Sequence, residues 1–181
     1  MIIMCLKVRS VAPDFVADAY ERGANKPKKI RLSDFRGKWV VLFFYPRDFT
    51  FVCPTEIERF AELEPEFRKE DAAIIGVSTD SFYSHKAWYE TDERLKKVDF
   101  PIIADTTLAI SRAYGVLNEE DGSAFRATFI IDPNGVVRHV TVNDMDVGRS
   151  VDETLRTLRA LKTGELCPAE WRLGMKTLGR V

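Results

Sequence analysis

The sequence predicts an α/β fold in one domain. Two segments with the pattern of a buried strand, Trp39 to Tyr45 and Ala72 to Ser78, are each followed by a segment with helical spacing of its apolar residues. Alternation of strand and helix is typical of a sheet covered by helices. The chain has 181 residues, which is enough for one domain with a real core and too few for two large ones.

The first elements are predicted to be extended. Apolar and polar residues alternate from Val11 to Ala19, and a polar loop with Gly, Asn and Pro runs from Glu21 to Lys29. This pattern predicts an edge hairpin or an extended entry segment. Ile30 to Gly37 is expected to form a short helical turn that ends at its glycine. Trp39 to Tyr45 is continuously apolar and rich in β-branched and aromatic residues, so we expect a strand buried on both faces.

The middle of the chain is predicted to be mainly helical. From Thr55 to about Lys69, apolar residues fall at helical spacing with charges between them, which predicts an amphipathic helix. We expect further helices from Phe82 to about Lys96 and from Thr107 to Tyr114. A short extended piece, Pro101 to Ala104, separates these two helices.

The last elements are predicted to be a hairpin and a helix. Ala124 to Ile131 and Val136 to Val142 flank the strong turn sequence Asp-Pro-Asn-Gly, so they should pair antiparallel. Apolar residues then share one face of a final helix that begins near Val151 and ends at Gly164. Strand, helix, strand, helix, hairpin and helix is the order of a thioredoxin-like fold, with a central mixed sheet flanked by helices.

Composition and charge exclude several functional classes. Lys and Arg number 27 against 28 for Asp and Glu, with no long block of one sign, which argues against a polyanion or a membrane surface as the main partner. No segment approaches the roughly 18 apolar residues of a membrane span. The apolar start, Met1 to Leu6, is broken by Lys7 and Arg9, so we expect mature cytoplasmic protein rather than a signal segment.

Three cysteines, an odd number spread far apart, do not form the framework of a disulfide-rich secreted domain. They indicate chemistry, metal binding or ordinary packing. Metal is the weakest of these, because the cysteines and the two histidines show no ligand pair at metal-site spacing. We therefore expect no metal and no cofactor.

Cys53 stands where an apolar run ends and a helical pattern begins. Pro54 and Glu56 suit the first turn of a helix, so Cys53 should lie at or just before that turn. Unpaired backbone N–H groups and the helix dipole favour an anionic sulfur there. A thioredoxin-type oxidoreductase would have a second cysteine three residues earlier, where this chain has Thr50. A single nucleophile is predicted.

The residues Pro46, Thr50 and Cys53, spaced Pro-x-x-x-Thr-x-x-Cys and followed by Pro-Thr-Glu, resemble the active-site signature of the peroxiredoxins. Arg126 in Phe-Arg-Ala-Thr-Phe-Ile-Ile-Asp and Cys167 in Glu-Leu-Cys-Pro-Ala-Glu-Trp agree with it. The chain is similar to the typical two-cysteine enzymes of the alkyl hydroperoxide reductase C type. The resemblance implies a thioredoxin-like domain with an N-terminal extension over residues 1–165 and a C-terminal tail over 166–181.

The resemblance also implies a reaction cycle. Cys53 would attack hydrogen peroxide or an organic hydroperoxide and become a sulfenic acid, and Cys167 would condense with it to a disulfide. A thioredoxin-like protein or a flavoprotein would then reduce the disulfide. In the family the two cysteines belong to different subunits of an antiparallel dimer, and five dimers often form a ring. An oligomeric chaperone or a peroxide sensor on the same fold is the alternative.

Ionising the thiol cannot account for fast peroxide reduction. A thiol of ordinary pKa is about 3% thiolate at pH 7, and a pKa of about 6 would raise this to about 90%, a gain of only about thirtyfold. The developing charge on the departing oxygen must therefore be stabilised. The hydroxyl of Thr50, the guanidinium of Arg126 and nearby backbone N–H groups are the candidate donors.

Further roles follow from the resemblance. Pro46 would shield the site, while Glu56 and Arg149 would orient Arg126. Without the family, the better interpretation of Glu56 is an ordinary first-turn helix residue, and that of Arg149 is a solvated loop charge. We also expect the first helical turn to unwind, so that Cys53 can meet a cysteine in the C-terminal segment, which is predicted to be mobile.

Other residues are expected to have structural roles. Cys5 is interpreted as a packing residue or a free thiol. His85 is expected on a helix surface or at an interface, since no acidic partner can be assigned to it, and His139 is expected to be exposed. Members of the family that are sensitive to overoxidation carry Gly-Gly-Leu-Gly and a C-terminal Tyr-Phe. This chain has Glu119 to Ser123 at the expected loop and ends soon after Trp171, so we predict resistance to sulfinic-acid formation.

Overall fold

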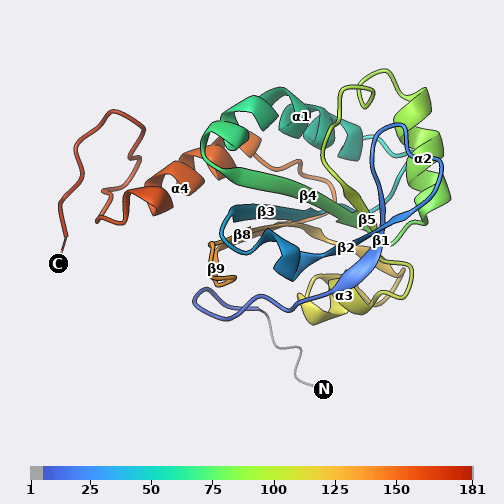
Figure 1. Ribbon diagram of the computed structural model, residues 1–181, viewed down its shortest axis with the longest axis horizontal. Helices are drawn as coiled ribbons and strands as arrows, with labels where there is room; N and C mark the ends of the chain where they lie inside the picture. The colour runs from blue at the N-terminus through green and yellow to red at the C-terminus, as the bar shows by residue number, and fades with distance from the viewer. Residues whose placement is uncertain (1–5, 181) are drawn as a thin grey trace.

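The computed structural model describes residues 6–180 and shows a seven-stranded mixed sheet with helices on both faces (Figure 1). Its strand order is β2-β1-β5-β4-β3-β8-β9, and β6 and β7 form a separate two-stranded sheet. The strands are β1 (Val16–Tyr20), β2 (Lys28–Arg31), β3 (Trp39–Phe44), β4 (Ala72–Ser78), β5 (Ile102–Ala104), β6 (Leu117–Asn118), β7 (Ser123–Ala124), β8 (Arg126–Ile131) and β9 (Val137–Asn143).

The sheet is parallel at its centre and antiparallel at its edges. Strands β3, β4 and β5 run parallel, β8 pairs antiparallel with β3 and with β9, and the β1–β2 hairpin joins antiparallel to β5. The helices are η1 (Leu32–Phe35, a 3₁₀ turn), α1 (Cys53–Lys69), α2 (Phe82–Thr91), α3 (Ala109–Ala113) and α4 (Val151–Thr163). The predicted α/β architecture and the order of the main elements are confirmed.

Two apolar cores lie on the two faces of the sheet. Alternate residues of β3 point to opposite faces, as the pleat of a strand requires. Val41 and Phe43 pack with α1, α2 and α4 in one core, whereas Leu42 and Phe44 pack with α3 and η1 in the other. This arrangement explains why the segment reads as a continuous apolar run, and it confirms a strand buried on both faces.

Several boundaries differ from the predictions: β1 begins only at Val16, and Ile30 belongs to β2 rather than to the helical turn. Helix α2 ends at Thr91, not near Lys96, because the Asp92 carboxylate accepts the backbone N–H of Arg94 and forms a turn. Helix α3 begins only at Ala109, since the preceding Leu108 has a left-handed backbone with φ of 62°. The strand predicted from Ala124 is divided, so that β7 ends at this residue and β8 begins at Arg126.

The segment after α4 folds back on itself. The helix ends at Gly164, whose φ is 64°, as the sequence predicts. Beyond it, the N–H of Leu166 donates to the carbonyl of Gly179, and Trp171 is buried at 3% exposure. Figure 1 shows this segment beyond the end of α4, away from the sheet. No helix within residues 6–180 is long and apolar enough to cross a membrane. Cys5 lies outside the described residues.

Candidate active site

Cys53 is the first residue of α1, directly after the loop that follows β3. Pro54 occupies the first turn, where its missing N–H costs no hydrogen bond. The sulfur belongs to the core between α1 and the sheet, and Cys53 is 0% exposed. The position predicted for this cysteine, at the start of a helix, is confirmed.

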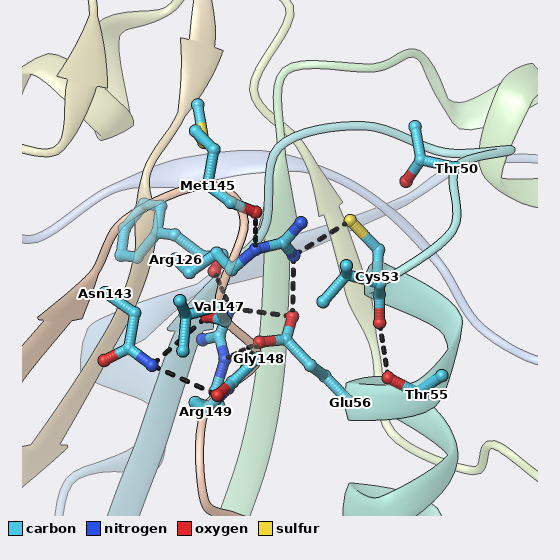
Figure 2. Close-up of polar contacts among 12 residues, drawn as sticks. Thr50, Cys53, Thr55, Glu56, Arg126, Asn143, Met145, Val147, Gly148 and Arg149 are labelled. Atoms are coloured by element: carbon cyan, nitrogen blue, oxygen red, sulfur yellow. Dashed lines mark hydrogen bonds and ion pairs between the residues drawn. The ribbon is translucent and has the colours of Figure 1, made fainter.

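Arg126 is the first residue of β8 and reaches the sulfur from the neighbouring strand. Its Nη1 lies 3.3 Å from Sγ of Cys53 and 3.0 Å from Oε2 of Glu56 (Figure 2). Its Nε donates to the carbonyl of Met145 at 2.6 Å. The side chain is held at both ends of the guanidinium and is 5% exposed. Such fixed donors can act on a reacting oxygen without first having to reorganise.

Glu56 and Arg149 support this arginine from behind. Glu56 lies three residues after Cys53, on the same side of α1, and its Oε1 accepts from the backbone N–H of Arg149 at 2.9 Å and from its Nε at 3.0 Å. Nη2 of Arg149 also donates to the carbonyl of Phe44, and its guanidinium lies 5.4 Å from the centre of the Phe43 ring. Arg149 is therefore a buried structural charge and not a solvated loop residue.

The charged side chains of this cluster do not balance one another. Two guanidinium groups, those of Arg126 and Arg149, are matched by one carboxylate, that of Glu56, and all three side chains are nearly fully buried. A buried cluster with a net positive charge is costly, so it interacts favourably with negative charge that develops beside it. Cys53 contacts the positive side of the cluster through Nη1 of Arg126.

Thr50 and Pro46 lie in the loop between β3 and α1. Pro46 is buried, as a shielding residue would be. The hydroxyl of Thr50 donates to the carbonyl of Arg47 at 2.8 Å and not to the sulfur. Figure 2 shows Thr50 on the side of the thiol opposite to Arg126. The structure thus places Arg126 at the sulfur with Glu56 and Arg149 behind it, while the Thr50 hydroxyl stays bonded within its own loop.

Cys167 has different surroundings. It is half-buried beyond the end of α4, with Sγ 3.4 Å from Oγ1 of Thr163 and 3.6 Å from the carbonyl of Ala160. It lines an open cavity of about 500 Å³ together with Arg138 and Leu166. Cys53 and Cys167 are both free thiols in this structure.

The two thiols lie near opposite ends of α1. Helices α1 and α4 run side by side in the same direction, since Arg59 in α1 pairs with Asp152 at the start of α4 at 2.7 Å. Glu70, just after α1, pairs with Lys162 near the end of α4 at 3.0 Å. The 17 residues of α1 span about 25 Å. A bond between the two thiols of one chain would therefore require a large rearrangement.

Two expectations for histidine were wrong. His85 is 0% exposed, and its Nδ1 lies 2.8 Å from Oδ2 of Asp48, so it has the acidic partner that the sequence did not indicate. Its spacing from Phe82 and Tyr89 on the apolar side of α2 was the signal that could have placed it inside. His139 is half-buried, and this burial lowers its pKa. Within the described part of the chain, no cluster of His, Cys, Asp and Glu is placed to bind a metal.

Comparison with known proteins gives consistent matches. Residues 8–140 match the AhpC/TSA family. Mouse peroxiredoxin-2 is 51% identical over 174 residues, which cover 92% of this chain and 87% of that protein. A thioredoxin peroxidase of Trypanosoma brucei rhodesiense is 52% identical over 83% of this chain and 79% of its own.

Solved structures agree with these matches. The reduced 2-Cys peroxiredoxin of Plasmodium vivax superposes with a TM-score of 0.88 at 38% identity, over 93% of this chain and 91% of that one. AhpC of Mycobacterium bovis superposes with a TM-score of 0.85 at 42% identity, over 93% of this chain and 99% of that one. The thioredoxin-like fold predicted for the chain is thereby confirmed.

Proposed function

The chain belongs to the AhpC/TSA family and is a thiol-dependent peroxidase, and we propose that Cys53 is the thiol that attacks the peroxide. The observation that carries this proposal is the buried sulfur at the start of α1, 3.3 Å from the guanidinium of Arg126. The substrates are hydrogen peroxide and organic hydroperoxides.

In the first step the Cys53 thiolate attacks the terminal oxygen of the peroxide. The S–O bond forms as the O–O bond breaks, and the departing oxygen takes the electron pair and a proton to leave as water or an alcohol. Arg126 stabilises the charge that develops on this oxygen, while Glu56 and Arg149 hold the guanidinium in place. Pro46 shields the site, and Thr50 provides a polar group at its edge.

In the second step Cys167 of another subunit condenses with the Cys53 sulfenic acid, which forms the disulfide and releases water. The separation of the two thiols along α1 supports a bond between chains rather than within one. Because Cys53 is fully buried, the first turn of α1 must unwind before the bond can form. This mechanism requires at least a dimer, and a ring of five dimers is the larger assembly that we propose.

In the third step an external dithiol reduces the disulfide. A related protein from Trypanosoma brucei rhodesiense is named thioredoxin peroxidase, which supports a thioredoxin-like reductant for this chain, with a flavoprotein reductase as the other possibility. The chaperone or sensor alternative needs the thiol but little turnover. The relatives named peroxiredoxin-2 and thioredoxin peroxidase favour the enzyme.

Two serine variants test the cycle. Cys53→Ser should abolish peroxide consumption with dithiothreitol as reductant. Cys167→Ser should still reduce one equivalent of peroxide rapidly and then accumulate a sulfenic acid that dimedone traps. Peroxide should convert the unsubstituted protein to a covalent dimer on a non-reducing gel, and neither variant should give that band. Turnover by Cys53→Ser would refute the first step, and an oxidised protein that stays monomeric with both thiols intact would refute the second.

A further inference from the structure

The loop between β3 and α1 contains a buried carboxylate, that of Asp48, which joins the loop to the protein interior. This residue is 7% exposed and lies two positions before Thr50. Its Oδ1 accepts from the hydroxyl of Tyr45 at 2.8 Å, and its Oδ2 lies 2.8 Å from Oγ of Ser84 and 2.8 Å from Nδ1 of His85. The side chains of Tyr45, which directly follows β3, and of Ser84 and His85 in α2 thus converge on one buried carboxylate.

The protons in this cluster can be assigned from its acceptors. Nε2 of His85 lies 3.2 Å from the carbonyl of Ile103 in β5, and a carbonyl can only accept, so Nε2 carries a hydrogen. Nδ1 lies 2.8 Å from Oδ2 of Asp48, which is hydrogen-bond distance. Burial, together with the charge of Asp48, raises the pKa of Tyr45 well above its ordinary value, so the hydroxyl remains a donor.

Packing alone does not account for such a cluster. Buried ionic groups cost desolvation free energy, and apolar residues of similar volume often stabilise a core equally well. Here the polar groups lie directly beneath the reactive loop. The backbone N–H of Asp48 also donates to Oδ2 of Asp80 at 2.9 Å, so both the main chain and the side chain of this residue are fixed.

The loop needs such a restraint. Phe49, which lies between Asp48 and Thr50, has a φ of 56°, a left-handed conformation that is unfavourable for a bulky side chain. Residues in this region persist only where their neighbours hold them. The next contact along the loop is the hydrogen bond from the Thr50 hydroxyl to the carbonyl of Arg47. If Asp48 were released, the strained backbone could relax and carry Thr50 with it.

We propose that Asp48, held by Ser84 and His85, is a positioning residue for peroxide reduction, which fixes the Arg47–Thr50 segment beside the sulfur. The proposal rests on the role proposed for Cys53. Asp48 does not touch the thiol, so it acts through the loop. A displacement of about 1 Å in an active site can cost about 100-fold in rate. We therefore expect Asp48→Asn to lower kcat/KM for hydrogen peroxide by about 10- to 100-fold, because an amide cannot accept from all the donors that surround it.

The test compares three variants with the unsubstituted protein. Asp48→Asn disturbs the cluster most, and Ser84→Ala removes a single donor to it. Asp105→Asn is the matched control, since Asp105 is also buried and accepts two backbone N–H groups, those of Ile110 and Ser111, beside α3. Peroxide consumption with dithiothreitol gives kcat/KM, and the rate of Cys53 alkylation by iodoacetamide reports whether the thiol is still reactive.

A positioning role predicts opposite responses of the two rates. In Asp48→Asn, peroxide reduction should fall while alkylation stays the same or becomes faster, because a loosened loop exposes the sulfur without removing its charge. Ser84→Ala should show a smaller fall of about threefold to tenfold, and Asp105→Asn should stay within about twofold in both rates. If Asp48→Asn does not fold, as judged by circular dichroism, Ser84→Ala decides the question.

The outcomes separate this inference from the proposed function. Variants of Asp48 and Ser84 that fold and keep kcat/KM within twofold would overturn the inference, even if Cys53→Ser is inactive. An equal fall in Asp105→Asn would also overturn it, since the effect would then reflect general destabilisation. Full turnover by Cys53→Ser would instead refute the role proposed for Cys53.

Discussion

Cys53 and Cys167, the two cysteines within residues 6–180, occupy sites of opposite character. Cys53 is fully buried at the first residue of a long helix, 3.3 Å from a guanidinium that is itself fixed by a carboxylate and a carbonyl. Cys167 is half-buried after the last helix, and its sulfur contacts a hydroxyl and a carbonyl, both uncharged. The sulfur of Cys53 thus contacts a charged group, whereas the sulfur of Cys167 contacts uncharged groups.

The difference fits the two different tasks that we propose for these thiols. Attack on a peroxide creates negative charge on oxygen, and only fixed donors in a site closed to water stabilise it strongly. Condensation with a sulfenic acid requires two sulfur atoms to meet, which depends on access. A half-buried sulfur with uncharged contacts, beside an open cavity of about 500 Å³, suits the second task better than a buried sulfur in a charged cluster. Substitutions near each thiol test whether their surroundings differ in function as they do in structure.

The largest effect should come from the buried carboxylate near Cys53. Glu56→Gln leaves the guanidinium groups of Arg126 and Arg149 without their anion, and breaking a buried ion pair in this way costs about 3–5 kcal/mol of the free energy of unfolding. Urea denaturation measures it. Glu165→Gln, close to Cys167, is the control, and it should cost less than about 1 kcal/mol because Glu165 is partly solvated. Equal losses would show that the two regions are equally dependent on charge.

The second effect concerns the rate of peroxide reduction. Arg126→Gln removes the guanidinium beside the sulfur, and loss of one fixed donor to a transition state costs about 100- to 1,000-fold. Arg138→Gln, which changes an arginine at the cavity of Cys167, should alter this step by less than about twofold. Rapid mixing with hydrogen peroxide in single turnover measures both. A slow reaction in Arg138→Gln would mean that the surroundings of Cys167 also contribute to the first step.

The third effect separates two threonines. Thr50→Val removes a hydroxyl from the loop beside Cys53, and Thr163→Val removes the hydroxyl that lies 3.4 Å from Cys167. We expect the first change to slow peroxide reduction by about tenfold, which is less than for Arg126 because the Thr50 hydroxyl donates to Arg47. Thr163→Val should leave that rate unchanged, and Thr50→Ser should restore most of it. If Thr50→Val reacts at the normal rate, the donors at the sulfur suffice without Thr50.

Local patterns predicted the elements around Cys53 well. The apolar run of β3, the proline after the cysteine and the helical spacing that follows are all signals within a few residues of one another. By contrast, the contact of Arg126 with Cys53 depends on the pairing of β8 with β3, which joins residues more than 80 positions apart. Periodicity cannot reveal such a pairing, so the family resemblance had to provide the contact.

The missed features have different causes. Asp48 and His85 are separated by 37 positions, and their pairing depends on how α2 packs against the loop. The sequence alone therefore does not indicate a partner for His85. The strands β6 and β7 have two residues each, which is too short for any alternation to be visible. The direction of the Thr50 hydroxyl is set by the loop backbone, including the left-handed Phe49, and the residue types do not predict it.

The smallest effect should appear on the α4 side of the sheet, where His139 of β9 is half-buried. Burial lowers its pKa, because the charged imidazolium loses water. The unfolded chain therefore binds the proton more readily, so the contribution of this group to stability is complete above a pH of about 6.5 and is lost as the pH falls. Between pH 7.5 and 5.5 the unsubstituted protein should lose more stability than His139→Gln, by no more than about 1 kcal/mol. Urea unfolding at the two pH values measures the difference. Equal losses in the two proteins would mean that burial does not lower the pKa of His139.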